Sequence, residues 1–268
     1  MPVSDPDPTP RAVRAGSAPH GGIAALNTVV AAVRSAITYV AISLYVLIVA
    51  PLGMLLAASF RWKGILYVLG HGGVALGLSL LGIRYRVVGS EHVPPRAVVF
   101  CANHQSNVDP PVLFRALQSR LHILYKAELK KLPILGRAFE LGGFVPVDRA
   151  SRERSITAIE RGAQSLRAGN SFLTFPEGTR SRSGELLPFK KGGFLMAIKA
   201  QVPVVPVAVQ GGAAAMRKGS AIVRPVTVSI RIGTPIDTEG MGASDRDRLI
   251  SRVRASIEGL LAQGEIRS

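Results

Sequence analysis

A histidine and an aspartate five residues apart are the residue types in this chain best suited to chemistry. His104 and Asp109 lie in the segment Asn103–Pro111, directly after an apolar run that ends near Ala102. An aspartate followed by Pro110 predicts the start of a helix, since proline is favoured at the first helical position. His104 therefore falls in a turn between a strand and a helix, at the edge of a sheet where ligands usually bind.

This spacing requires an irregular turn, because residues five apart on a regular helix point about 140° away from each other. In such a turn a neutral imidazole could take the proton of an alcohol that attacks a carbonyl, which is worth about 10²–10⁴-fold in rate. A carboxylate on the other ring nitrogen would fix the tautomer and stabilise the imidazolium. A thioester releases a thiolate, a good leaving group, so no covalent serine intermediate would be needed. Taken alone, the pair is also explained by His104 bonding the turn and Asp109 capping the helix.

A second candidate site is the segment Phe175–Ser181, which follows a predicted strand at 171–175. Gly178 permits a tight backbone approach to a ligand. Thr179 offers a hydroxyl, and Arg180 presents a planar guanidinium that suits a phosphate. Further cations follow at Arg182, Lys190 and Lys191. The alternative interpretation is a loop with a solvated arginine.

These two segments resemble the first and third signature motifs of the 1-acylglycerol-3-phosphate acyltransferase (PlsC-type) family. Gly143–Arg149 resembles the second motif, and Val202–Val207 resembles the fourth. The resemblance covers residues 84–235 and implies transfer of a fatty acyl group from acyl-CoA or acyl-ACP to the sn-2 hydroxyl of 1-acylglycerol 3-phosphate, giving phosphatidic acid. It leaves open the same chemistry on another lysolipid, such as lyso-ornithine lipid or lysophosphatidylglycerol.

The resemblance also implies a role for each motif residue. His104 is expected to be the general base and Asp109 the carboxylate that orients it. Arg149 and Arg180 are expected to bind the substrate phosphate. The residues expected to shape or line that pocket are Glu177, Gly178, Thr179 and Lys126, although a solvated strand end explains Lys126 nearly as well. Neither a metal nor a cofactor is expected, and the expected partners are a lysophospholipid, an acyl thioester (with acyl carrier protein as one candidate donor) and the bilayer.

The elements that must position these residues alternate between strands and helices from Arg84 onward, which is typical of an α/β domain. We expect a mixed, largely parallel sheet flanked by helices, with the acyltransferase domain at 84–268. The predicted strands are 84–89, 97–102, 122–126, 143–147, 171–175, 203–210 and 226–232. The predicted helices are 109–119, 133–141, 151–168, 190–200 and 244–262. Strict alternation predicts that the last strand is half-exposed, and Ser244 with Asp247 suggests a capping box for the last helix.

Residues 23–83 are predicted to anchor the chain in a membrane. No charge occurs in the 26 residues from Ser35 to Phe60, whereas about 20 apolar residues suffice to cross a bilayer. A second uncharged run extends from Gly64 to Ile83. The alternative is two core helices of a soluble fold. Pro51 could break the first run, so a transmembrane hairpin and a re-entrant or monotopic anchor both remain open. Residues 1–22, rich in Pro, Ala, Gly and Arg, are predicted to be a disordered tail.

The formal charge of +16 indicates a basic surface, which would suit nucleic acid, anionic lipid or a phosphate-bearing substrate. An aromatic content of 6% and the lack of a recognised nucleic-acid module argue against nucleic acid. The lack of a Gly-x-Ser-x-Gly elbow argues against a lipid hydrolase. We expect the inner cell membrane, with the active site facing the cytoplasm. The single cysteine, Cys101, excludes an intramolecular disulfide and is expected to be buried.

Overall fold

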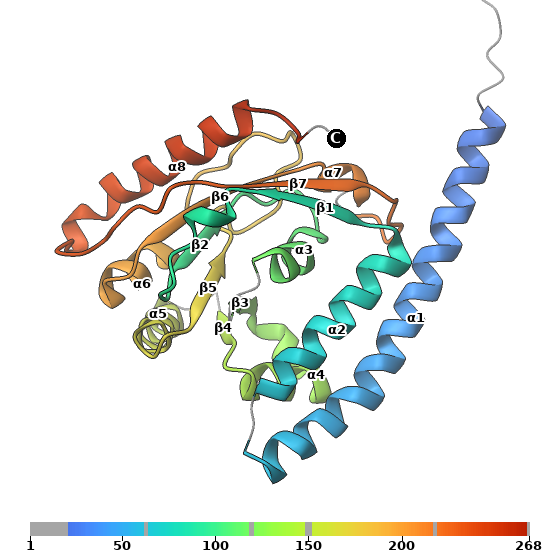
Figure 1. The fold of residues 1–268 in the computed structure, drawn as a ribbon, viewed down its shortest axis with the longest axis horizontal. Helices are drawn as coiled ribbons and strands as arrows, with labels where there is room; N and C mark the ends of the chain where they lie inside the picture. Colours follow the sequence, from blue (N-terminus) through green and yellow to red (C-terminus); the bar gives the residue numbers. More distant parts are fainter. Residues whose placement is uncertain (1–20, 62–63, 118–120, 148–151, 217–218, 267–268) are drawn as a thin grey trace, which may run out of the picture.

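The computed structural model describes residues 21–61, 64–117, 121–147, 152–216 and 219–266. Two long helices come first, α1 (Gly21–Ser59) and α2 (Gly64–Leu81), and the sheet follows (Figure 1). The predicted tail lies almost entirely outside this range, so its disorder stays a prediction.

Seven strands form one sheet in the described part of the chain, in the order β1-β7-β6-β2-β5-β3-β4. They are β1 (Arg84–Val88), β2 (Val99–Ala102), β3 (Leu121–Lys126), β4 (Val145–Val147), β5 (Ser171–Thr174), β6 (Val204–Gln210) and β7 (Thr227–Ile232). The five neighbouring strands from β6 to β4 run parallel, β7 is antiparallel to β6, and β1 is parallel to β7. The predicted mixed, largely parallel sheet is confirmed.

Side chains of the sheet alternate between two cores, as the two-residue period of a strand requires. Val98 and Phe100 pack on one face with α2 and α3 (Asp109–Ala116). Val99 and Cys101 pack on the other, against α5 (Arg152–Arg167), α6 (Gly192–Ala200) and α8 (Arg246–Ala262). The remaining elements are α4 (Pro133–Leu141), α7 (Gly212–Ala215) and the short 3-10 helices Ser90–His92, Ala127–Lys131 and Ala243–Asp245. Cys101 is fully buried, and this burial raises the pKa of its thiol.

One local prediction held only in part, and one was wrong. On the polar face of strand β7, Thr227 is exposed and Arg231 is half-buried, but Ser229 is buried and accepts a hydrogen bond from the Ile266 backbone N–H. The segment after α8 therefore covers that face at Ser229. The capping box of α8 does not involve Ser244 and Asp247. Instead, Asp245 precedes the helix and accepts the Gly242 N–H at 2.9 Å.

Helix α1 continues through Pro51, so the proline does not break the apolar run. Both α1 and α2 are long and apolar enough to cross a membrane, with mean hydropathies of 2.4 and 1.7 in their most apolar windows, of which 11% and 17% is buried. That small burial argues against core helices of a soluble fold. One stripe of α1 docks on the domain, where the Ser35 hydroxyl accepts the Val223 N–H and the Tyr39 hydroxyl donates to the Ala221 carbonyl.

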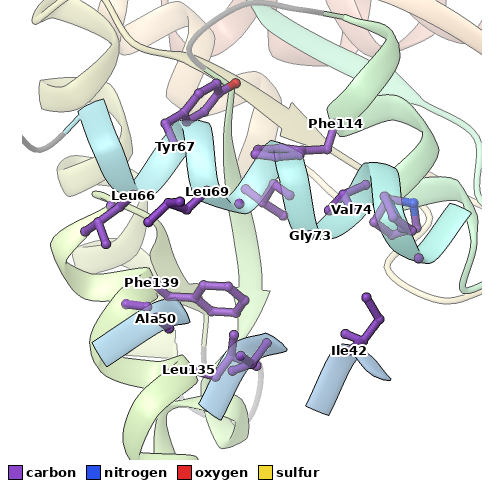
Figure 2. A pocket seen from close by; sticks show the side chains of 18 of the residues that line it. Ile42, Ala50, Leu66, Tyr67, Leu69, Gly73, Val74, Phe114, Leu135 and Phe139 are labelled. Carbon is purple, nitrogen blue, oxygen red and sulfur yellow. The ribbon is translucent and has the colours of Figure 1, made fainter. Parts of the chain in front are cut away.

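A cavity of about 1200 Å³ lies between the two long helices and the domain. Figure 2 shows side chains of α1, α2, α3 and α4 around it, including Ile42, Leu69, Phe114 and Phe139. Its lining is mainly apolar and extends to Asn107, Val108 and Pro110, at the start of α3. His71 of α2 stacks on Phe114 at the edge of this apolar region.

Candidate active site

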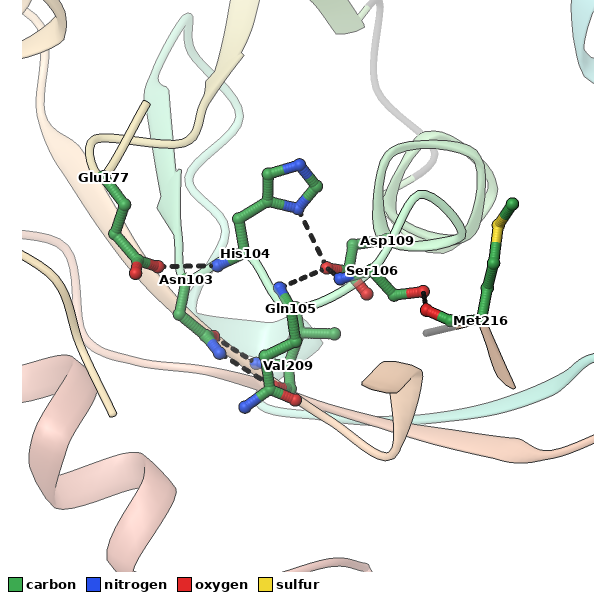
Figure 3. Close-up of polar contacts among 8 residues, drawn as sticks. All are labelled: Asn103, His104, Gln105, Ser106, Asp109, Glu177, Val209 and Met216. Carbon is green, nitrogen blue, oxygen red and sulfur yellow. Dashed lines mark hydrogen bonds and ion pairs between the residues drawn. The ribbon is translucent and has the colours of Figure 1, made fainter. Parts of the chain in front are cut away.

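The turn between β2 and α3 holds His104 against Asp109 (Figure 3). Asp109 is fully buried. Its Oδ2 accepts three hydrogen bonds, from His104 Nδ1 at 2.9 Å and from the backbone N–H groups of Gln105 and Ser106 at 2.7 Å each. An ionised carboxylate only accepts, so Nδ1 carries the proton and Nε2 keeps its lone pair. The irregular turn that the spacing requires is present.

The loop after β5 holds His104 at three points. The imidazole stacks on the Phe175 ring, with 4.2 Å between the ring centroids. The His104 N–H donates to Glu177 Oε1 at 2.7 Å, and the His104 carbonyl accepts the Ser181 N–H at 2.8 Å. The His104 side chain is 15% exposed, and Figure 3 shows its second ring nitrogen pointing away from Asp109. A reactant can therefore approach Nε2.

Glu177 lies behind this turn. It is 3% exposed, and its other carboxylate oxygen accepts the Leu187 N–H at 3.0 Å. Burial raises the pKa of the Glu177 carboxyl, although the two backbone donors oppose the shift. We expected Glu177 to shape the phosphate pocket. Both of its oxygens bond backbone amides, and one of these amides belongs to His104, so Glu177 holds the His104 turn; its part in a phosphate pocket stays a prediction.

Gly178 has a left-handed backbone with φ of 69°. A Cβ at this position would lie within 2.8–3.0 Å of the Cδ, Cε and Nζ atoms of Lys190. The glycine was expected to admit a ligand, and the structure shows that it admits the Lys190 side chain. Thr179 is exposed and Arg180 is half-buried on the same loop. Thr179, Arg180 and Lys190 thus all lie in the chain between β5 and α6, and their binding of a phosphate stays a prediction.

The sheet order explains why separate motifs meet. Strands β2, β5, β3 and β4 are parallel neighbours, so their carboxyl ends share one edge, where ligands bind in α/β folds. His104 follows β2, the Phe175–Ser181 loop follows β5, and Lys126 ends β3. The Lys126 side chain and all of Arg149 lie outside the described part of the structure. Their contacts stay predictions.

Sequence reasoning missed the residues that fix this turn from the side of β6. The Asn103 side chain bonds the N–H and the carbonyl of Val209, at 2.7 and 2.9 Å. The Ser106 hydroxyl donates to the Met216 carbonyl at 3.1 Å. No local signal could have shown these pairs, because each is more than 100 residues apart in the chain. Among the described residues, no three His, Cys, Asp or Glu side chains are grouped as a metal site would require.

Residues 84–210 match the model of the Acyltransferase family. The chain is 34% identical over 171 residues to the 1-acyl-sn-glycerol-3-phosphate acyltransferase of Limnanthes douglasii, covering 63% of this chain and 60% of that protein. It is also 34% identical over 180 residues to 1-acyl-sn-glycerol-3-phosphate acyltransferase alpha of Homo sapiens, covering 66% and 64%. The chain thus spans less than two thirds of the length of these curated relatives.

The fold is similar to a solved structure of known activity. The crystal structure of the 1-acyl-sn-glycerophosphate (LPA) acyltransferase PlsC from Thermotoga maritima superposes with a TM-score of 0.72 at 25% identity. The match covers 88% of this chain and 99% of that one, so it extends well beyond the residues of the family match. The four motifs, the shared fold and these relatives together show that the chain is similar to the 1-acyl-sn-glycerol-3-phosphate acyltransferases, with residues 84–210 matching the Acyltransferase family.

Proposed function

We propose that this protein transfers a fatty acyl group from an acyl thioester to the sn-2 hydroxyl of 1-acylglycerol 3-phosphate, forming phosphatidic acid. The observation that carries the proposal is the His104–Asp109 pair, in which Nδ1 is bound to a buried carboxylate and Nε2 is left for a reactant. The names of the relatives support this acceptor.

In the proposed reaction, His104 Nε2 accepts the proton of the sn-2 hydroxyl while the hydroxyl oxygen attacks the thioester carbonyl carbon. The C–S bond then breaks, and the imidazolium gives its Nε2 proton to the departing thiolate, which leaves as a thiol. Asp109 stabilises the imidazolium between these steps and holds the ring in one tautomer. No acyl-enzyme is formed, and no cofactor takes part besides the acyl donor itself.

We propose that the acceptor phosphate binds at the Phe175–Ser181 loop. Arg180 would supply the planar cation, and Thr179 would supply a hydroxyl. Lys190 adds an ammonium beside Gly178 on the same loop. Arg149 and Lys126 would complete the pocket from the ends of the two neighbouring strands.

The apolar cavity beneath α1 and α2 suits an acyl chain. It extends to the residues that open α3, next to the catalytic turn. Large apolar side chains of α1 remain exposed, among them Ile37, Leu44 and Ile48, and such a surface is typical of contact with a membrane. Lipid substrates could therefore pass between the bilayer and the site without crossing water.

The net charge fits the same setting. Cations near a membrane surface gain about 1 kcal/mol each from anionic lipid, and the same field attracts an acidic lysolipid and an acidic carrier protein. We propose that the chain resides in the inner cell membrane with its site facing the cytoplasm, and that it accepts acyl-CoA or acyl-ACP.

The proposal is tested with purified protein in anionic vesicles, by measuring thiol release and lipid product. Each donor is combined with 1-acylglycerol 3-phosphate, lysophosphatidylglycerol, lyso-ornithine lipid or no acceptor. Product from 1-acylglycerol 3-phosphate that is lost in His104→Ala and declines with added salt is the expected result. Turnover on another acceptor alone, or free fatty acid without acceptor, would replace the proposed reaction with a different one.

A further inference from the structure

The segment that joins β6 to α7 lies against the catalytic turn. Strand β6 ends at Gln210, Gly211 takes a left-handed backbone with φ of 88°, and α7 begins at Gly212. Three hydrogen bonds join residues on either side of this segment to the turn: the Asn103 side chain bonds the N–H and the carbonyl of Val209, and the Ser106 hydroxyl donates to the Met216 carbonyl. A further contact lies between them and involves Gly212 and Asp109.

Gly212 faces the carboxylate oxygen that the dyad does not use. Asp109 Oδ1 is buried and has no hydrogen-bond partner within the described ranges. A Cβ at Gly212 would come within 3.0 Å of this oxygen, which real Cβ atoms essentially never do. It would also lie 3.4 Å from Ser106 Cβ and 3.5 Å from Asp109 Cγ. The oxygen therefore rests against bare backbone.

We infer that Gly212 is a positioning residue for the His104–Asp109 pair. Its lack of a side chain lets the Asp109 carboxylate sit in the rotation that presents Oδ2 to His104 Nδ1 and to two backbone N–H groups. None of the four motifs includes Gly212. It reaches the site because β6 pairs with β2, so that the ends of the two strands lie side by side. The inference rests on the proposed function only in taking His104 as the base.

A methyl group at position 212 would clash with the Asp109 carboxylate, and that carboxylate is the group that can move most easily. The Gly211 carbonyl accepts the Ala214 N–H, and the Gly212 carbonyl accepts the Met216 N–H, so the short α7 turn is held on its own side. The carboxylate must then rotate or withdraw, which lengthens the bond to His104. A misplacement of about 1 Å can cost about 10²-fold in rate.

The test compares Gly212→Ala with Gly259→Ala. Gly259 lies on α8, and a Cβ there would meet nothing within 4 Å. For Gly212→Ala we expect kcat to fall about 10²-fold, with KM for the acceptor changed less than twofold. Gly259→Ala should retain both constants. A KM rise with unchanged kcat would overturn the inference.

A second measurement needs no turnover and therefore separates this inference from the proposed function. In ¹⁵N-histidine-labelled protein, the His104 Nδ1 proton, bonded to a carboxylate, should give a downfield resonance. Gly212→Ala should shift or abolish it, and Gly259→Ala should retain it. If the wild-type protein transfers no acyl group but these signals behave as stated, the inference holds and the proposed function fails.

Tm measurements on the single and double variants of Gly212 and Asp109 distinguish a positioning role of Gly212 from simple misfolding of the variant. Asp109→Ala removes the oxygen that a Gly212 methyl would meet. If Gly212 acts through Asp109, then Gly212→Ala should lower the Tm of the wild-type protein and leave that of Asp109→Ala nearly unchanged. Equal losses of Tm in both backgrounds, or an unaltered Nδ1 proton in Gly212→Ala, would refute the role.

Discussion

Replacing Asp109 with asparagine keeps the shape of the side chain and removes its charge. The backbone N–H groups of Gln105 and Ser106 both point at Oδ2, so the amide oxygen of the asparagine should occupy that position. The His104 Nδ1 proton then still finds an acceptor, and the tautomer is retained. The substitution therefore isolates the electrostatic contribution of the carboxylate to the imidazolium.

The expected size of this contribution follows from the geometry. The 2.9 Å bond between Nδ1 and Oδ2 places the two charges about 4 Å apart, which is worth about 4 kcal/mol at an effective dielectric constant of about 20. A loss of about 4 kcal/mol from the transition state lowers kcat about 10³-fold. Three weakened hydrogen bonds cost about 3 kcal/mol of stability, and part of that is returned because a neutral group is cheaper to bury.

The assay is thiol release at saturating acceptor, with the Tm measured on the same samples. Asp247→Asn is the matched control, because Asp247 is 66% exposed at the surface of α8. It should retain wild-type kcat. A folded Asp109→Asn protein with kcat within tenfold of wild type would show that the carboxylate does not stabilise an imidazolium, and the proposed mechanism would have to be abandoned.

Three further results are expected. Burial raises the pKa of Glu177 above its usual 4.5, so its stabilising effect is present at low pH and lost as the pH rises through the raised value. As the pH rises through the pKa of Glu177 in the folded protein, the Tm of the wild-type protein should fall relative to the Tm of Glu177→Gln. Parallel plots of Tm against pH for the two proteins would contradict this. Gly70 lines the cavity with nothing within 4 Å of a Cβ, so Gly70→Leu should shift donor preference in a chain-length series toward shorter acyl chains. An unchanged preference would place the chain elsewhere. Arg180→Ala should raise KM for 1-acylglycerol 3-phosphate at least tenfold, which corresponds to a loss of about 1.4 kcal/mol in binding free energy. Arg252→Ala on α8 is the control and should leave KM unchanged.

The fold was predictable where its signals were local. The central parallel strands β2 and β5 are short runs buried throughout, Val99–Ala102 and Ser171–Thr174, and such runs are visible in the sequence. The His104–Asp109 contact was predictable for the same reason, because six residues contain both partners and the turn between them. Helix α7 was not predicted, since a run of glycine and alanine has no apolar period.

The surroundings of the site could not be predicted, because tertiary packing builds them. Glu177 reads as a loop carboxylate in the sequence, and only the folded chain shows backbone N–H groups on both of its oxygens. The polar face of β7 reads as exposed until the C-terminal segment is seen to bond Ser229. Lys190 follows Gly178 by twelve residues, and nothing local indicates that its side chain crosses that glycine.

The burial of Cys101 has a practical consequence for spectroscopy. It is the only cysteine in the sequence. It lies on β2 with its side chain fully buried and its thiol pKa raised by desolvation, so thiol-labelling reagents will not modify it in the folded protein. A cysteine introduced on the outer face of α1, at Val40 for example, would then be the single site of attachment for a spin label or fluorophore. The depth of α1 in a bilayer could then be measured without first replacing the native cysteine.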